Sequence, residues 1–241
     1  MSDARIAAAI AEEAGQLLVA IQREGGADAG ARGDAEANRL ILDRLREARP
    51  DDAILSEESA DDLTRLDARR VWIIDPLDGT REFGEGRDDW AVHVALAIDG
   101  APAIGAVALP ARGIVLASDA PPALPAPAMP PRMLVSRSRP SQLCASVRDM
   151  LGAETIAMGS AGAKAMAVAL GEAEIYLHSG GQHQWDNCAP AAVALATGLH
   201  ASRIDGSPLA YNARATSVPD LLICRKEFAQ AVLAAIDASL R

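Results

Sequence analysis

Prolines concentrate in one short segment near the middle of the chain, and this segment limits how the chain can fold. Residues 119–131 (DAPPALPAPAMPP) contain six of the 14 prolines in a chain of 241 residues. Because proline has a fixed φ and no backbone N–H, neither a helix nor a central strand tolerates this density. We therefore expect an extended, semi-rigid connection between an N-terminal subdomain (1–118) and a C-terminal subdomain (132–241).

Hydrophobic patterns differ on the two sides of this connection. Before it, we expect a helix at 4–24, a glycine-rich loop at 25–33 and a second helix with Asp34 as its N-cap. Strands are predicted at 53–56, 71–75, 90–98, 103–110 and 113–118. After the connection, strands at 132–136, 155–158 and 174–178 alternate with helices at 140–151, 160–172, 186–198 and 226–240. An α+β half followed by an α/β half predicts a layered sandwich of alternating helices and sheets.

Charge and composition exclude several classes of partner. The net charge is −10 and only 3% of the residues are aromatic, which disfavours a polymeric nucleic acid or an anionic membrane surface. No apolar run approaches the roughly 20 residues that span a bilayer. Cys144, Cys188 and Cys224 are far apart and form no CxxC pair. They predict buried thiols in a reducing compartment, rather than disulfides or a zinc site, and hence a cytoplasmic protein.

Acidic residues stand where predicted strands end or a predicted helix begins. Glu57 follows the strand 53–56, Asp75 ends the strand 71–75, and Asp186 begins a helix. Clustered carboxyl groups raise one another's pKa values unless a cation keeps them ionised. Hard oxygen ligands of this kind select Mg²⁺, Mn²⁺ or Ca²⁺ over zinc.

The hexapeptide Asp75-Pro76-Leu77-Asp78-Gly79-Thr80 makes the prediction of a metal site sharper. Its proline and glycine favour a tight turn in which both carboxylates and the Leu77 carbonyl face one centre. The N–H groups of the last two residues could then hold a phosphate oxygen. An ordinary solvated turn is the competing interpretation. A haloacid-dehalogenase-type nucleophile is excluded, because the residue two before Asp78 is a proline.

Three segments together resemble the inositol monophosphatase superfamily, the lithium-sensitive, magnesium-dependent phosphatases. They are Ser-Glu-Glu-Ser at 56–59, Asp-Pro-Leu-Asp-Gly-Thr-x-x-Phe at 75–83 and Trp-Asp-x-x-Ala-Pro at 185–190. The resemblance extends from the first helix to 202–209. Within the superfamily, the segments 86–93 and 159–166 resemble the actinobacterial form of the CysQ-type 3′(2′),5′-bisphosphate nucleotidases. The fold implied is the layered sandwich of the sugar phosphatases, with the metal site in the N-terminal subdomain.

The resemblance also implies a metal centre with two or three Mg²⁺ ions, for which Mn²⁺ could substitute. Glu57, Asp75 and the Leu77 carbonyl would hold one ion. Asp75, Asp78 and Asp186 would hold a second one, with Asp75 bridging the two.

The resemblance assigns the remaining site residues as well. Thr80 and Asp34 would orient and deprotonate the attacking water, and Glu58 would support the metal ligands. The implied substrate-binding residues are Glu57, Leu77, Asp78, Gly79, Thr80, Gly159, Ser160, Lys164 and Asp186. Two positions depart from the pattern: residues 27–33 lack the usual lysine and Val-Thr pair, and Ser56 stands where a glycine is usual. Asp34 could therefore be only a helix cap.

For three histidines and one lysine, a purely structural role is weighed against a role in the site. His93 is expected to be a packed core histidine, whereas His178 and His183 lie close enough to Asp186 in sequence for a substrate contact. Lys164, one of only two lysines, could be a solvated helix residue or a phosphate contact.

The activity implied is removal of the 3′-phosphate from adenosine 3′,5′-bisphosphate, and from its sulfated analogue, during sulfate assimilation. Inositol 1-phosphate and fructose 1,6-bisphosphate are the alternative substrates, because the metal motif contacts only the phosphate. A catalytically silent metal-binding regulator ranks last, since all four carboxylates are present. A homodimer is implied by the resemblance alone.

Overall fold

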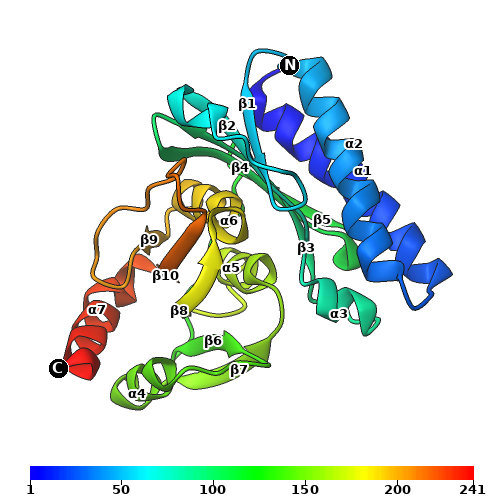
Figure 1. Ribbon diagram of the computed structural model, residues 1–241. Coiled ribbons are helices and arrows are strands. Elements are labelled where there is room, and N and C mark those ends of the chain that lie inside the picture. The colour runs from blue at the N-terminus through cyan, green and yellow to red at the C-terminus, as the bar shows by residue number, and fades with distance from the viewer.

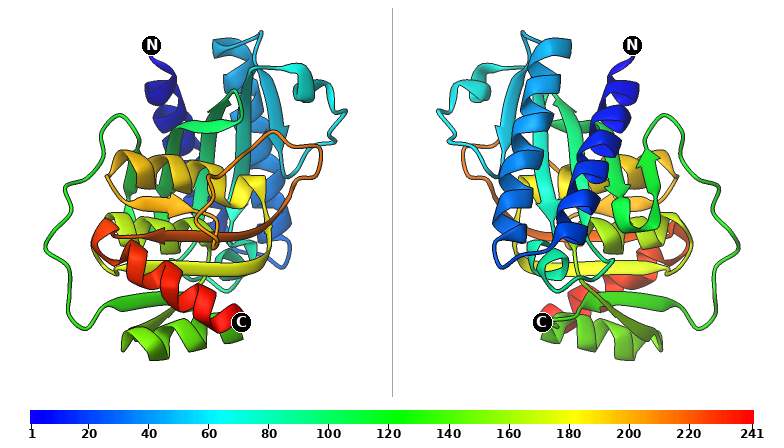
Figure 2. Two further views of the ribbon diagram at one scale, coloured as in Figure 1. Left: turned by 90° about the vertical axis from the view of Figure 1, so that its left-hand side faces the viewer. Right: turned by 90° about the vertical axis from the view of Figure 1, so that its right-hand side faces the viewer.

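Helices and sheets alternate through the computed structural model, which describes residues 1–241 (Figures 1 and 2). The outer helices on one side are α1 (Asp3–Glu24) and α2 (Ala29–Ala48). They cover a sheet of β1 (Ala53–Ser56), β2 (Arg70–Asp78), β3 (Ala91–Ile98), β4 (Ala101–Leu109) and β5 (Ile114–Ala117). The middle layer contains α5 (Ala161–Ala169) and α6 (Gln184–Ala196).

The second sheet and the last helices complete the sandwich. The sheet comprises β6 (Arg132–Ser136), β7 (Glu154–Met158), β8 (Ile175–His183), β9 (His200–Ser202) and β10 (Ser217–Cys224). Its outer face is covered by α4 (Gln142–Leu151) and α7 (Lys226–Leu240). Short helical elements are α3 (Thr80–Gly84), η1 (Thr64–Asp67) and η2 (Pro110–Arg112). The layered α/β sandwich expected from the sequence is confirmed.

Strand order places β2 inside the first sheet. The order is β1-β2-β3-β4-β5, with β1 parallel to β2 and the other pairs antiparallel. The order of the second sheet is β7-β6-β8-β10-β9, in which β6 is parallel to both neighbours. Helices pack on both faces of β2, which explains why its residues from Val71 onward are all buried.

The apolar core between the two sheets is shared by both halves of the chain. It joins side chains of the first sheet, of α5 and α6, and of the second sheet into one cluster. Small residues allow the close approach, because a Cβ on Gly105 of β4 would lie 2.5 Å from the carbonyl oxygen of Ala189 in α6. Residues 119–131 form neither helix nor strand and link β5 of one sheet to β6 of the other. No helix is long and apolar enough to cross a membrane.

The predicted start of the second helix is wrong. α2 begins at Ala29 with Asp28 as its N-cap, so the loop covers only 25–28 and Asp34 lies inside the helix. Glycines normally weaken a helix, but here they let α2 pack closely on its neighbours. A Cβ on Gly33 would lie 2.9 Å from Leu18 of α1, and one on Gly30 would lie 3.1 Å from the Thr80 side chain. Tertiary contacts therefore make residues 29–33 helical, although their glycines are typical of a loop.

Other boundaries also shift, and some elements were not predicted. β2 continues through Asp78 instead of ending at Asp75, and β8 continues to His183 instead of ending at 178. α6 begins at Gln184, two residues before Asp186. The helix α3 and the strands β9 and β10 have no counterpart in the sequence analysis. In β10, Pro219 lies where the pairing register shifts, which breaks the pattern expected of a strand.

Candidate active site

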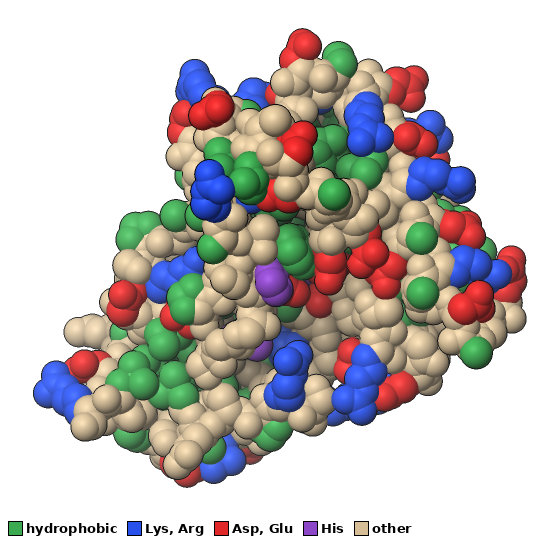
Figure 3. Space-filling model, in the orientation of Figure 1, with side chains coloured by type: hydrophobic (Ala, Val, Ile, Leu, Met, Phe, Trp, Pro, Cys, Tyr) green, Lys and Arg blue, Asp and Glu red, His purple; other side chains and the backbone are tan.

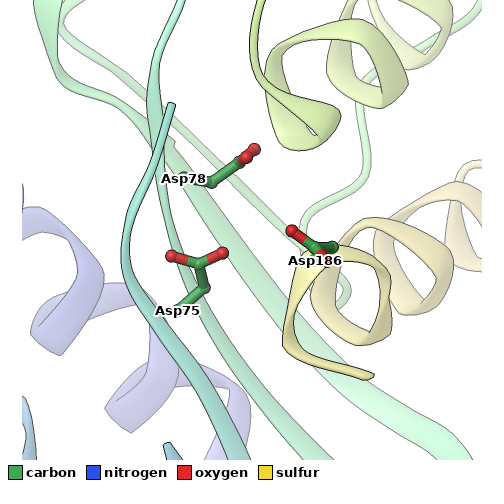
Figure 4. A group of neighbouring side chains, drawn as sticks. All are labelled: Asp75, Asp78 and Asp186. Atoms are coloured by element: carbon green, nitrogen blue, oxygen red, sulfur yellow. The ribbon is translucent and has the colours of Figure 1, made fainter. Parts of the chain in front are cut away.

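Asp75 and Asp78 project from an irregularity in β2. The register between β2 and β3 shifts between these two residues, and the N–H of Leu77 donates to Asp75 Oδ1 at 3.1 Å. Gly79, with φ +94°, then turns the chain into α3. Asp186 comes from the first turn of α6, across the shared core. One oxygen from each of these aspartates lies within 4.8 Å of the others, and Figure 4 shows the three side chains close together, with the Asp78 carboxylate directed away from Asp75.

Burial and mutual repulsion perturb these carboxyl groups. The pKa of Asp75 is raised well above its usual range, chiefly by burial and then by the charge of Asp78. Burial and Asp78 also raise the pKa of Asp186 to about 6. Repulsion of this kind is relieved when a divalent cation is shared by the oxygens. The oxygen-only donor set and these raised pKa values fit Mg²⁺ or a similar hard cation.

Asp78 differs from its neighbours because donors surround it. Burial raises its pKa, but hydrogen bonds outweigh burial and lower the value to about 2. Ser160 Oγ donates to Asp78 Oδ2 at 2.5 Å, and the N–H of Gly162 donates to the same oxygen at 2.6 Å. His93 Nε2 lies 3.3 Å away from it. Asp78 thus connects β2 to the first turn of α5.

His93 is a core residue, as expected, and it also contacts the acidic cluster. Its ring is fully buried, and Nδ1 lies 3.0 Å from the carbonyl oxygen of Trp185. A Cβ on Gly162 would lie 2.0 Å from Nε2, so only glycine lets α5 approach this ring. In the sequence, His93 is marked only as a polar residue in an apolar strand, and nothing there connects it with the acids.

A second acidic group lies beside this cluster, on α2 and the loop after β1. Burial raises the pKa of Asp34 to about 7, with a further contribution from Glu58. Burial, followed by the charge of Asp34, raises the pKa of Glu57 to about 7 as well. Thr80 Oγ1 lies 3.2 Å from Asp34 Oδ2 and 3.1 Å from the Leu77 carbonyl oxygen. Asp34 is therefore not a helix cap but a buried carboxyl group facing Thr80.

The second acidic group has one unsatisfied oxygen, and its loop is held by a neighbouring asparagine. Asp34 Oδ1 is buried without any hydrogen-bond partner, so one acceptor of this carboxyl group is left unsatisfied. Asn38, one turn along α2, fixes the loop that carries the glutamates. It accepts from Ser56 Oγ at 2.7 Å and donates to Ser59 Oγ at 3.2 Å. Sequence reasoning missed Asn38, since nothing near it in the chain marks it.

Asp78 and Asp186 border a cavity of about 430 Å³ that extends toward the second sheet. Figure 3 shows acidic side chains inside this hollow and basic side chains along its lower rim. Gly159, Ser160 and Lys164 line the cavity near the start of α5. The Lys164 ammonium, whose pKa burial lowers, already donates to the carbonyl oxygens of Ser160 at 2.5 Å and Gly159 at 3.0 Å. Its predicted phosphate contact stays a prediction.

Arg139 and His178 also line the cavity and lie outside the acidic cluster. The Arg139 side chain is exposed and forms no ion pair. His178 Nε2 lies 2.6 Å from the Gly180 carbonyl oxygen, and burial lowers the pKa of its ring. Arg139 was missed because one arginine among 21 carries no local signal.

Comparison with known proteins places this geometry in a family. Residues 2–120 and 132–241 match the inositol monophosphatase family, leaving out little more than the proline-rich connection. The chain is 52% identical over 238 residues to "3′-phosphoadenosine 5′-phosphate phosphatase" of Mycobacterium tuberculosis, covering 93% of this chain and 89% of that one. The chain belongs to the inositol monophosphatase family. This family is metal-dependent, which agrees with the acidic cluster.

Two more distant relatives carry the name CysQ. The chain is 33% identical over 194 residues to "3′(2′),5′-bisphosphate nucleotidase CysQ" of Escherichia coli K12, covering 75% of this chain and 78% of the relative. The crystal structure of CysQ from Bacteroides thetaiotaomicron superposes with a TM-score of 0.79 at 24% identity, covering 93% of this chain and 97% of that one. This last likeness concerns the fold alone.

Proposed function

We propose that this family member is a Mg²⁺-dependent phosphomonoesterase that converts adenosine 3′,5′-bisphosphate into AMP and phosphate. It would act in the same way on the sulfated analogue, within sulfate assimilation. The observation that supports this best is the cavity itself, which Asp78 and Asp186 of the acidic cluster line together with the unpaired cation Arg139. Supporting it, the relatives at 50–52% identity are named for 3′-phosphoadenosine 5′-phosphate, which is the same compound.

The oxygen donors suited to Mg²⁺ are those that the resemblance implied. Asp75, Asp78 and Asp186 converge, while Glu57 and the Leu77 carbonyl lie at the edge toward Asp34. When bound, two or three Mg²⁺ ions would neutralise the phosphate and acidify the attacking water, and Mn²⁺ could replace them.

The remaining residues would position the water and the phosphate. Asp34, with a pKa near 7, accepts the proton of the attacking water at its free Oδ1 atom. Thr80 Oγ1 orients that water, and Glu58 maintains the negative field around Asp34. The N–H groups of Gly79 and Thr80 hold the phosphate, because phosphoryl transfer depends mainly on positioning and charge.

A substrate panel tests this proposal. With saturating Mg²⁺, kcat/KM for adenosine 3′,5′-bisphosphate should exceed that for inositol 1-phosphate or fructose 1,6-bisphosphate by at least about tenfold, which corresponds to 1.4 kcal/mol. Phosphate release without Mg²⁺, after treatment with EDTA, should be negligible. A preference for either sugar phosphate would replace this proposal with the alternative substrate. No release from any substrate would favour the metal-binding regulator.

Arg139 provides a second test, because the bisphosphate carries a phosphate that inositol 1-phosphate lacks. A charge-assisted hydrogen bond contributes about 1.5–3 kcal/mol, so Arg139→Ala should raise KM for the nucleotide roughly 10- to 100-fold. KM for inositol 1-phosphate should stay unchanged, and Arg139→Lys should retain part of the affinity. Equal losses on both substrates would place Arg139 at the scissile phosphate instead. Lys164→Ala should impair both substrates, since its ammonium also ties the carbonyls at the start of α5.

The cellular setting is also proposed. Cys144, Cys188 and Cys224 are free and buried, which fits a reducing compartment such as the cytoplasm. The homodimer stays an expectation from the family resemblance.

A further inference from the structure

An arginine of the second half holds a short helix of the first half. Arg137 directly follows β6, and its Nη2 donates to Glu82 Oε1 and to Glu85 Oε2, each at 2.8 Å. Glu82 lies within α3 and Glu85 immediately follows it. The Glu82 side chain is only 8% exposed, so its charge depends on this partner.

The same stretch is tied to the C-terminal half at a second place. A Cβ on Gly159 would lie 2.3 Å from Glu82 Cγ, so α3 packs directly on the turn between β7 and α5. Asp89 Oδ2 accepts from the Gly159 N–H at 2.6 Å, and Arg87 donates to both oxygens of Asp89. The segment that contains α3 is therefore held by charged contacts across the cleft.

α3 cannot hold its own position. It has five residues, and so short a helix gains little stability from its own hydrogen bonds. On its inner side, Phe83 packs edge-to-face on Trp90 with ring centroids 5.0 Å apart. On its other side, α3 contacts the second half of the chain through the ion pairs with Arg137 and through the packing of Glu82 on Gly159. The first residue of α3 is Thr80, whose hydroxyl faces Asp34.

We propose that Arg137 is a positioning residue for the phosphatase reaction, acting through α3 on the Thr80 hydroxyl. The proposal rests on the role given to Thr80 and Asp34 above. Removing Arg137 leaves Glu82 buried without a partner, so α3 moves outward to hydrate that charge. Thr80 then loses its alignment with Asp34. A displacement of about 1 Å can cost up to roughly 100-fold in rate without weakening substrate binding.

The chain offers a matched control for this contact. Arg112 of η2 pairs with Glu172, which also joins the two halves, and the exposed fractions of the two side chains are 34% and 42%. Those of Arg137 and Glu85 are 28% and 37%. Neither Arg112 nor Glu172 borders the cavity. Arg112→Ala therefore removes an ion pair that matches Arg137–Glu85 in exposure, lies away from α3, and leaves no buried carboxylate such as Glu82 without its partner.

The experiment compares Arg137→Ala, Arg137→Lys and Arg112→Ala by steady-state kinetics and by amide hydrogen exchange of residues 79–86. Arg137→Ala should lower kcat by about 10- to 100-fold with KM changed less than about threefold, and should speed exchange in this segment. Arg137→Lys should recover part of kcat, and Arg112→Ala should change neither quantity. If Arg137→Ala does not fold, Glu85→Gln should show the same two effects more weakly.

Several results would overturn the proposal. They are unchanged exchange in Arg137→Ala, equal exchange in Arg137→Ala and Arg112→Ala, and a rise in KM at constant kcat, which would make Arg137 a substrate-binding residue. Hydrogen exchange needs no turnover, so it decides the role of Arg137 in α3 even if the wild type hydrolyses none of the proposed substrates.

Discussion

Asp75→Asn is expected to lower Mg²⁺-dependent turnover by at least about 10³-fold, which is the scale on which a preorganised charge in a buried site contributes. Asp75 is 1% exposed, and its pKa is raised by burial and by the charges of Asp78, Glu57 and Asp186. It is therefore the carboxylate that most other acids of the site face. Initial rates at saturating substrate, with circular dichroism as the check of folding, measure the effect.

Asp99→Asn is the matched control for that substitution. Asp99 is an exposed residue with φ +50° after β3, a conformation that asparagine adopts readily, and its partner is Arg69. The activity of the Asp99→Asn variant should match that of the wild type. Near-normal turnover of a folded Asp75→Asn variant would refute the assignment of Asp75 as the shared ligand.

The stability of the metal-free protein should fall as the pH rises from 5 to 8. The folded-state pKa values of Asp34 and Glu57 are raised to about 7, and that of Asp186 to about 6, against usual values near 4. A carboxyl group whose pKa is raised by folding stabilises the folded state fully below about pH 4. This contribution is lost as the pH rises through 6 to 7. Asp78, whose pKa is lowered, acts in the opposite sense and loses its contribution only in acid.

Mg²⁺ should offset this loss, because it binds the ionised carboxylates. At a free concentration about 100 times Kd it stabilises by about 2.7 kcal/mol, which corresponds to a rise in Tm of roughly 5–10 °C for a chain of this length. Thermal unfolding with and without Mg²⁺ should show this rise at pH 8 and a much smaller one at pH 5. Asp75→Asn should raise Tm of the metal-free protein at pH 8. An equal Mg²⁺-induced rise in Tm at pH 5 and at pH 8 would contradict the claim that Mg²⁺ binds these carboxyl groups in their ionised form.

Sequence was most informative where chemistry is local. The hexapeptide at 75–80 contains two of the clustered acids, although the strand β2 continues through them with a register shift instead of forming the expected tight turn. Asp186, more than a hundred residues away, stood out as an acid at a predicted helix start, and the family resemblance then assigned it to the same metal site. The layered fold could be predicted from the hydrophobic periodicity, because this pattern shows which face of each helix or strand is buried.

What could not be predicted depends on contacts between distant segments. Gly30 and Gly33 look like a loop in the sequence, yet they permit α2 to pack against Thr80 and Leu18. That packing starts the helix early and makes Asp34 a buried carboxyl group. The pairing of Arg137 with Glu82 joins residues 55 positions apart, and no spacing rule anticipates it.

The most direct test of the central claim is the identity of the product formed from adenosine 3′,5′-bisphosphate. Wild-type protein with Mg²⁺ can be followed by phosphorus NMR, which distinguishes the 3′- and 5′-phosphates of the nucleotide. The proposed function predicts that the 3′ resonance disappears while inorganic phosphate and adenosine 5′-phosphate appear in equal amounts, and that EDTA stops the change. Loss of the 5′-phosphate instead, or an unchanged spectrum from a preparation that hydrolyses inositol 1-phosphate, would contradict it.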